Sequence, residues 1–179
     1  MKKNIEKIID IPEGIEVKIN GTEITAKSGG NEMKRKFGFS GKIEAENGKI
    51  KISAGKAGRK EAKIIGTFAG HIKNMLNGIK NPFEYHLEIC NVHFPMTVKA
   101  EKNKVVINNF LGETVPRIAE IVSGSNVKIE GHVIIVISSD VESAGQTAAN
   151  IERATKVGKR DRRVFQDGIF ITKKPGRDS

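Results

Sequence analysis

The chain contains 179 residues, of which 37% are hydrophobic and 29% charged, and its formal net charge at pH 7 is +10. This length fits one domain or two small ones, and so basic a chain is expected to bind an acidic partner, with nucleic acid as the first candidate. No apolar run reaches 18 residues and the N-terminus has no apolar signal segment, so we expect neither a membrane span nor secretion. The single cysteine, Cys90, allows no internal disulfide, which fits a reducing cytoplasm.

The first half of the chain is predicted to form short strands followed by one helix. Ile15–Lys18 and Ile24–Ala26 flank the dipeptide Asn20-Gly21, which is typical of a hairpin turn. A further strand is predicted at Lys49–Ser53. From Ala62 to Leu76, apolar residues recur at spacings of three and four, the pattern of one face of a helix.

The second half repeats this design. Phe83–Cys90 alternates apolar and polar residues, as a half-buried strand does, and is predicted to open a second domain after Asn81-Pro82. Met96–Lys99 and Val105–Ile107 match the first hairpin at an offset of 81 residues. Val133–Ser138 is continuously apolar and is therefore predicted to be central in its sheet.

A second helical stripe follows the first at a constant offset of 79 residues. It consists of Val141, Ala144, Ala148, Ile151 and Thr155. Ser139 and Glu142 form a capping-box pattern at its start. A glycine occupies the same place in both stripes, Gly66 and Gly145. Because glycine inside a helix costs roughly 1 kcal/mol relative to alanine, its repetition indicates close approach of another group, either the packed sheet or RNA.

The predicted fold class is therefore α+β, with two duplicated domains that each pack a small, mostly antiparallel sheet on one main helix. We place the domains at residues 1–81 and 82–172, followed by a basic tail at 173–179.

Positive charge is concentrated at both ends of the chain. Residues 1–81 have a net charge of +8, residues 82–144 of −3 and residues 145–179 of +5. In the first half, Lys34–Lys36 and the glycine-interrupted stretch Gly55–Lys60 are basic patches that fit a flexible RNA-binding loop and a solvent-exposed loop equally well.

A denser group of cations follows the second helix, with only Glu152 and Asp161 as nearby anions. Arginine can bind phosphate through two parallel hydrogen bonds, and lysine acts as a compact charge. We expect Gly158 to allow a sharp turn and Gln166 to contact a ribose or a base edge. The alternative is a solvated charged loop. The predicted RNA-binding residues are Arg153, Lys156, Lys159, Arg160, Arg162, Arg163, Gln166, Lys173 and Lys174.

Patterns of enzymes and of metal sites are missing from the sequence. No GxGxxG or GxxxxGK motif occurs. Glu84, His86 and Glu88 share one face of a predicted strand, where a solvent-facing polar row is favoured over a metal site. Cys90 has no partner typical of a catalytic nucleophile. We therefore predict a protein that is not an enzyme and needs no cofactor.

Two segments resemble a known family. GQTAANIERATKVGKRDRRVFQDGIFI, beginning at Gly145, resembles the C-terminal signature of the sixth protein of the large ribosomal subunit in its archaeal and eukaryotic form. GTFAGHIKNMLNGI, beginning at Gly66, resembles the N-terminal helix of that family, and the similarity runs from about Ile11 to Lys174. Bacterial members carry a Pro-rich, Lys/Gly-rich loop where this chain has Lys156–Gln166, so the resemblance points to an archaeal source.

The resemblance implies a cytoplasmic, structural component of the large ribosomal subunit. The family binds large-subunit rRNA near the stalk base and the sarcin–ricin loop, beside other ribosomal proteins and where translation factors dock. In that family the second domain and its basic extension make much of the rRNA contact. The alternative is a free-standing basic RNA-binding protein outside the ribosome.

Overall fold

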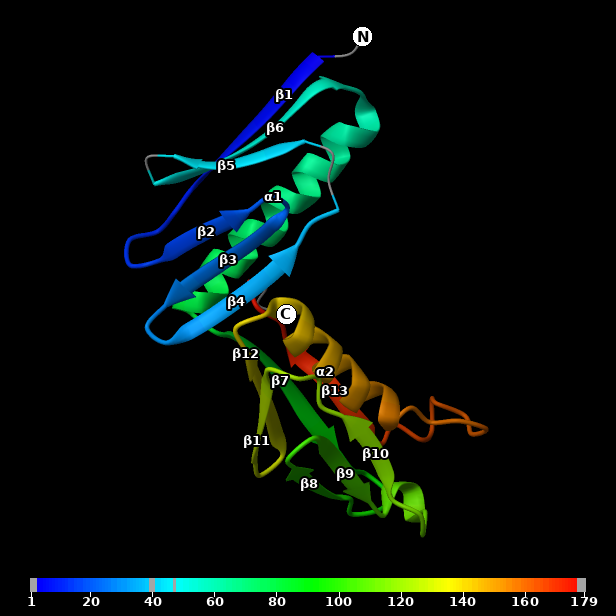
Figure 1. The fold of residues 1–179 in the computed structure, drawn as a ribbon. Helices are drawn as coiled ribbons and strands as arrows, with labels where there is room; N and C mark the ends of the chain where they lie inside the picture. The colour runs from blue at the N-terminus through cyan, green and yellow to red at the C-terminus, as the bar shows by residue number, and fades with distance from the viewer. Residues whose placement is uncertain (1–2, 39–40, 47, 177–179) are drawn as a thin grey trace. The chain divides into compact units, whose positions relative to one another are not determined.

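The computed structural model describes residues 3–38, 41–46 and 48–176, and the chain divides into two compact units, Met1–Asn81 and Pro82–Ser179. Each unit has a hydrophobic core of its own, and none of the residues of one core belongs to the other. In each unit a long helix lies on antiparallel strands (Figure 1).

In the first unit the helix α1 packs on two three-stranded antiparallel sheets. Their strand orders are β1-β6-β5 and β2-β3-β4. The strands are β1 (Lys3–Asp10), β2 (Glu16–Asn20), β3 (Glu23–Ser28), β4 (Asn31–Lys36), β5 (Lys42–Glu46) and β6 (Lys49–Ala57), and α1 spans Arg59–Lys80. The apolar face of α1 is buried on β1, β3, β4 and β6, because its stripe residues Ile65, Ile72 and Leu76 are almost fully inaccessible to solvent.

The second unit has the same plan with one strand added. Its sheets have the orders β11-β12-β7-β13 and β10-β9-β8. The strands are β7 (Phe83–Cys90), β8 (Thr97–Glu101), β9 (Lys104–Asn108), β10 (Arg117–Glu120), β11 (Ser125–Glu130), β12 (Val133–Ser138) and β13 (Gly168–Lys173), and the helix α2 spans Val141–Ala154. The continuously apolar β12 lies between β11 and β7, as predicted.

The prediction of an α+β fold with a duplicated design is confirmed. The last four positions of the stripe are buried in both units, as Ile65, Ala69, Ile72 and Leu76 in one and as Ala144, Ala148, Ile151 and Thr155 in the other. The strand β13 has no counterpart among the described residues of the first unit. It pairs with the edge of β7 that corresponds to the free edge of β1. The added segment therefore returns to the sheet after leaving α2.

Two local predictions need correction. The N-cap of α2 is Asp140 and not Ser139, because the Asp140 carboxylate accepts hydrogen bonds from the backbone N–H groups of Glu142 and Ser143, both at 3.2 Å. A carboxylate also complements the positive end of the helix dipole, which a hydroxyl does not. In the first hairpin, Asn20 pairs with Glu23 inside the strands, so the turn consists of Gly21 and Thr22.

The two helix glycines have different surroundings. A Cβ atom added to Gly145 would lie 2.9 Å from the hydroxyl oxygen of Tyr85 on β7 and 3.3 Å from its Cζ. The close approach predicted at Gly145 is therefore that of a side chain of the packed sheet. A Cβ atom added to Gly66 would meet nothing within 4 Å, so the packing of the first unit does not require a glycine there.

Candidate nucleic-acid interface

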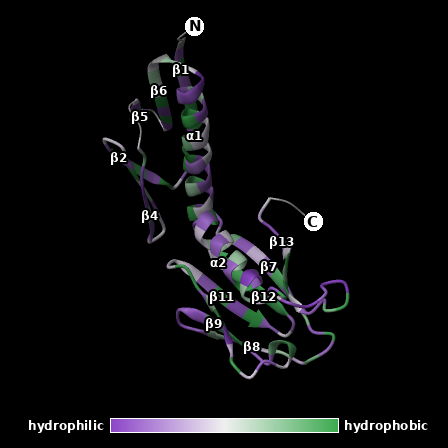
Figure 2. Ribbon diagram, turned by 90° about the vertical axis from the view of Figure 1, so that its right-hand side faces the viewer, coloured by the Kyte–Doolittle hydropathy of each residue, from purple (hydrophilic) through white to green (hydrophobic). Residues whose placement is uncertain are grey.

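A loop of the second unit connects α2 to β13 and carries most of the predicted RNA-binding residues. Figure 2 shows this loop mostly in the hydrophilic colour. Thr155 fixes its beginning: the side chain is 3% exposed, donates to the carbonyl of Glu152 at 3.1 Å and accepts from the backbone N–H of Ile169 at 2.9 Å. The buried Val157 adds a second apolar anchor. We call residues 156–166 the basic loop.

The end of the basic loop is held by Asp167, which is 1% exposed. Its carboxylate accepts from the backbone N–H groups of Val92 and His93, both at 3.1 Å, and lies 3.0 Å from Nδ1 of His93. Burial raises the pKa of Asp167, but the hydrogen bonds from His93 and Val92 outweigh burial and hold this pKa below its usual value. A buried carboxylate thus ties the loop to the segment that follows β7.

Arg117 on β10 fixes the start of the loop from the other side. Its Nη1 donates to the carbonyl oxygens of Ala154 at 2.9 Å and Lys156 at 3.0 Å. The remaining guanidinium nitrogens form a fork with Glu113, at 2.7 and 2.5 Å, and the group lies 4.2 Å from the centroid of the Phe110 ring. This fork lowers the pKa of Glu113, first through the hydrogen bond from Arg117. No sequence pattern indicates that Arg117 holds the loop, because the two carbonyl groups that it contacts lie 37 and 39 residues away.

Three of the predicted RNA-binding residues hold the shape of the loop itself. Arg163 forms a fork with Asp161, at 2.8 and 3.1 Å, which raises the pKa of Arg163 and lowers that of Asp161. The guanidinium of Arg160 lies 4.7 Å from the centroid of the Phe165 ring. The Gln166 amide donates to the carbonyl of Arg163 at 3.2 Å. Their charge remains available, but part of their bonding capacity is already in use.

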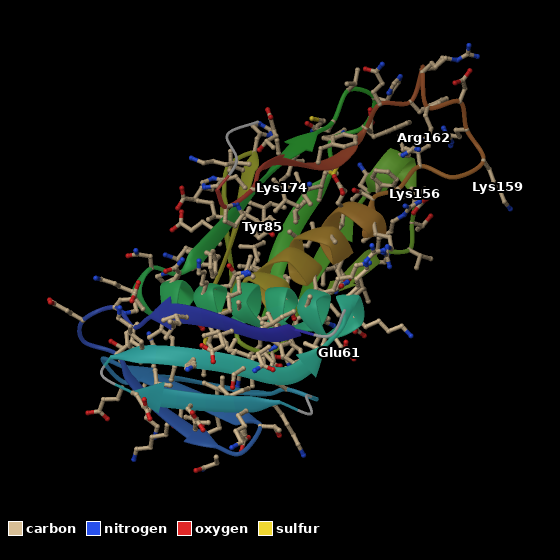
Figure 3. The ribbon with its side chains drawn as sticks, turned by 90° about the horizontal axis from the view of Figure 1, so that it is seen from above. Glu61, Tyr85, Lys156, Lys159, Arg162 and Lys174 are labelled. Carbon is tan, nitrogen blue, oxygen red and sulfur yellow. The ribbon has the colours of Figure 1, made fainter. Side chains whose placement is uncertain are left out.

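Lys156, Lys159 and Arg162 are different, because all three are exposed and none forms an ion pair with another described residue. Figure 3 shows Lys159 on the part of the loop farthest from the unit, with Lys156 and Arg162 nearer to α2. The sharp turn occurs at Lys159, whose φ is +57°, and not at Gly158, which we expected to supply it. A non-glycine residue in this left-handed region costs roughly 1–2 kcal/mol.

The structure does not bring all predicted residues together. Lys173 and Lys174 lie at the far end of β13 from the basic loop, as Figure 3 shows for Lys174. Arg153, in the last turn of α2, does lie beside Lys156, and both line one cavity. The candidate interface is thus a compact group at the junction of α2, the basic loop and β13. It comprises Arg153, Lys156, Lys159, Arg160, Arg162 and Arg163.

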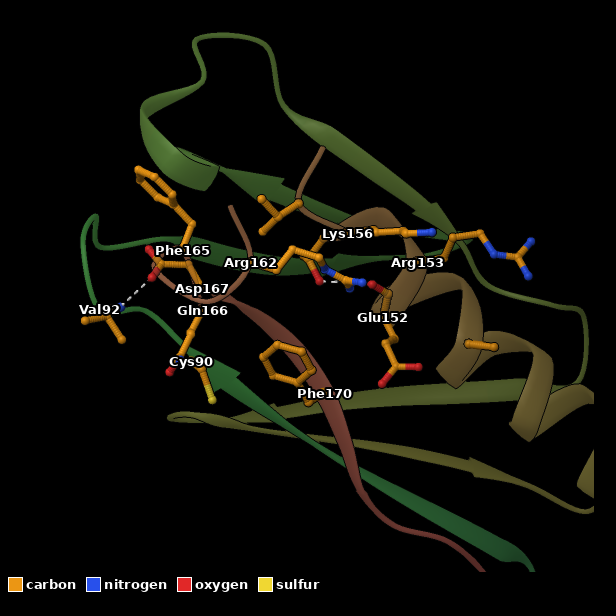
Figure 4. A pocket seen from close by; sticks show the side chains of 13 residues that line it. Cys90, Val92, Glu152, Arg153, Lys156, Arg162, Phe165, Gln166, Asp167 and Phe170 are labelled. Atoms are coloured by element: carbon orange, nitrogen blue, oxygen red, sulfur yellow. Dashed lines mark hydrogen bonds between the residues drawn. The ribbon is translucent and has the colours of Figure 1, made fainter. Parts of the chain in front are cut away.

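This cavity has a volume of ≈ 820 Å³ and lies between the end of α2, the basic loop and β13 (Figure 4). Its walls include Cys90, Glu152, Asp167 and Phe170, in addition to Arg153 and Arg162. No sequence pattern indicates this cavity, because Cys90 and Val92 on one wall are far along the chain from the wall residues that begin at Ala149.

The other predicted features contribute little to a site. Nζ of Lys34 lies 2.9 Å from Glu32, so part of the first basic patch is locally neutralised. The stretch Gly55–Lys60 is not a flexible loop, because it forms the end of β6, the N-cap Gly58 and the start of α1. No group of three His, Cys, Asp or Glu residues suited to a metal ion is found among the described residues. Within the same part of the chain, no helix is long and apolar enough to cross a membrane.

Comparison with known proteins gives a consistent result. The family model described as ribosomal protein L6 matches residues 94–168. The large ribosomal subunit protein uL6 of Methanococcus vannielii is 44% identical over 174 residues, which cover 97% of this chain and 96% of that protein. The protein of the same name from Archaeoglobus fulgidus is 44% identical over 176 residues, covering 95% and 90%. That of Ignicoccus hospitalis is 39% identical over 173 residues, covering 93% of each.

Proposed function

We propose that the chain binds large-subunit rRNA through the basic loop. The premise is that the chain belongs to the ribosomal protein L6 family and is a structural constituent of the large ribosomal subunit. The resemblance supports a position near the stalk base and the sarcin–ricin loop, beside neighbouring ribosomal proteins and where translation factors dock. The protein acts by holding its partners in place and is not an enzyme.

The observation that carries the proposal is a loop fixed at both ends with unpaired cations between. Thr155 and Arg117 hold its start and Asp167 holds its end. Lys156, Lys159 and Arg162 extend between these points without an ion pair to another described residue. Because the anchors are already formed, little conformational entropy is lost when the loop contacts phosphates. Fixed cations also release the counterions condensed on RNA, which makes binding strongly dependent on salt.

Salt dependence of rRNA binding tests this proposal. The triple variant Lys156→Gln/Lys159→Gln/Arg162→Gln removes the three unpaired cations and leaves the anchors intact. Each lost phosphate contact lowers the slope of log K against log salt by about 0.7–0.9, so we expect a slope shallower by about 2 to 3. The measurement is filter binding of the full chain to transcribed archaeal large-subunit rRNA over a series of KCl concentrations.

A matched control removes the same charge elsewhere in the second unit. Lys99, Lys102 and Lys128 are exposed on or between the strands of β8, β9 and β11. Their triple replacement by glutamine should leave the slope close to that of the unchanged protein. Equal slopes for the two triple variants would exclude the basic loop as the rRNA-binding element. Release from large subunits by a high-salt wash would instead indicate a free-standing RNA-binding protein.

A further inference from the structure

We propose that the cavity beneath the basic loop accepts one unstacked nucleobase of the bound rRNA, while the phosphates on either side stay outside on Arg153, Lys156 and Arg162. This inference rests on the proposed function and adds a specific site to it. It makes the interface more than a charged surface, because a nucleotide must leave its stack to occupy the cavity.

The size and walls of the cavity fit a flat heterocycle. Its volume of ≈ 820 Å³ lies within the range of about 300–1,000 Å³ that is usual for small-ligand pockets. Apolar wall residues include Val92, Ala149 and Val157, and cationic residues line the side formed by α2 and the loop. An apolar interior with cations beside it matches a nucleotide, whose base is flat and weakly polar and whose phosphate is charged.

Phe170 provides an aromatic surface for stacking. The ring lines the cavity and is 42% exposed, which is unusual for a phenylalanine in a strand of the sheet. It lies over Gly168: a Cβ atom added to Gly168 would be 2.9 Å from Cζ and 3.2 Å from Cε2 of the ring. The absence of a side chain at Gly168 therefore lets the ring lie down along the strand. Figure 4 shows the ring between Cys90 and Glu152 in the close-up of the cavity.

The second aromatic wall residue, Phe165, is already in use. Its ring centroid lies 5.0 Å from that of His93, and the guanidinium of Arg160 lies 4.7 Å from it. Phe165 thus stabilises the loop, and Phe170 is the ring that a base would contact.

The acidic wall residues indicate that a base enters and a phosphate does not. Glu152 accepts from the backbone N–H of Ile171 at 3.1 Å, and Asp167 accepts from Val92 and His93. These carboxylates are fixed by their hydrogen bonds, so they remain in the wall and repel an entering phosphate. The carboxylates in the cavity wall repel the phosphates, and the cations outside the cavity attract them. The phosphates are therefore expected at these cations.

Cys90 makes this proposal directly testable, because it is the only cysteine of the chain and it lines the cavity. Burial, together with Glu88 and Asp167, raises the pKa of its thiol, so alkylation with N-ethylmaleimide is followed at mildly alkaline pH. We expect transcribed archaeal large-subunit rRNA to slow the alkylation of Cys90 in the full chain. Ultraviolet cross-linking followed by mass spectrometry should find a nucleotide on the peptide that contains Cys90 or Phe170.

Substitution of Phe170 separates stacking from simple coverage by RNA. Phe170→Leu keeps an apolar residue but removes the ring, and Phe170→Tyr keeps the ring. Since stacking on an aromatic residue contributes about 1–3 kcal/mol per base, Phe170→Leu should weaken rRNA binding roughly 5- to 150-fold and abolish the protection of Cys90. Phe170→Tyr should bind as the unchanged chain does. Neither variant changes charge, so the salt slope should be the same in all three proteins.

The outcomes distinguish this inference from the proposed function. If the chain binds rRNA with a steep salt slope but Cys90 is alkylated at an unchanged rate and carries no nucleotide, the cavity is empty and the inference fails alone. If Cys90 is protected in assembled large subunits but not by rRNA, a neighbouring ribosomal protein fills the cavity, which also overturns it. If the chain does not bind rRNA, the proposed function itself fails.

Discussion

At the scale of single residues, Arg117 and Asp167 hold the basic loop in place through contacts between segments that lie far apart in the chain. Arg160, Arg163 and Gln166 make internal contacts of the loop, although their residue types also suit RNA. A position in a cationic run shows that charge is present, but it does not show which charges are already paired.

Arg117 should contribute to stability through its geometry more than its charge. The side chain is 25% exposed and donates to two carbonyl oxygens while it forms the fork with Glu113. Arg117→Lys keeps the charge but cannot make the four bonds together. We expect a loss of about 1.5–3 kcal/mol in the free energy of unfolding, measured by urea denaturation. Glu113→Gln, which spares the carbonyl contacts, should lose less. If Glu113→Gln lowered the free energy of unfolding more than Arg117→Lys does, the ion pair with Glu113 would contribute more to stability than the carbonyl contacts.

Asp167 should make the stability of the second unit depend on pH in the acidic range. Its folded-state pKa is lowered, so the stabilisation is fully present above the unfolded-state value of about 3.9 and is lost as pH falls through the folded-state pKa. Asp167→Asn should lower the free energy of unfolding by about 1–3 kcal/mol at neutral pH, because the amide replaces an acceptor oxygen by a donor. The difference between the two proteins should shrink toward pH 3 in urea denaturation at several pH values. A difference independent of pH would contradict this assignment.

At the scale of secondary-structure elements, the sequence predicts helices and strands that have a local pattern of apolar residues. It misses a strand that is defined only by its pairing with a neighbouring strand. Both helices follow from the spacing of apolar residues, and the first hairpin follows from its two flanking apolar segments, although its turn lies one residue later than the predicted Asn20-Gly21. The strand β4 was not predicted. Its sequence NEMKRK has one apolar residue, because an edge strand with a solvated face needs few. From the sequence, its basic residues indicate only the basic patch Lys34–Lys36. The cavity escapes prediction for a related reason, since its walls meet only in the folded unit.

The two copies of the helix provide a matched pair of glycine substitutions. Gly66→Ala should raise the free energy of unfolding by about 1 kcal/mol, because alanine has the higher helix propensity and nothing lies within 4 Å of the new Cβ. Gly145→Ala should not gain this amount, because its Cβ would lie 2.9 Å from the Tyr85 hydroxyl. The double variant Gly145→Ala/Tyr85→Phe, which lacks the Tyr85 hydroxyl, should recover part of the missing gain in the free energy of unfolding. Equal gains at both positions, measured by urea denaturation, would show that the Tyr85 ring moves aside freely.

At the scale of the whole molecule, a duplicated scaffold carries an added segment in one copy, the basic loop and β13. The sheet β1-β6-β5 corresponds to β7-β12-β11, and only the second unit continues into the basic loop and β13. In that unit the added strand covers the edge of β7 and buries Ile169 completely. The addition thus completes the sheet and anchors the candidate RNA-binding loop at the same time.

Two alterations should separate these roles. Deleting residues 156–179 removes Ile169 from the core and the whole ladder between β13 and β7. We expect hydrogen exchange, followed by mass spectrometry, to show lost protection in β7 and α2 while α1 and β6 stay protected, because the two units have separate cores.

Replacing residues 158–164 by a Gly/Ser segment of equal length keeps Val157, Phe165, Asp167 and β13. That variant should retain protection throughout and lose most of its rRNA affinity. Loss of protection in α1 after the deletion would contradict independent units. Unfolding of β7 in the replacement would instead show that the loop is part of the scaffold.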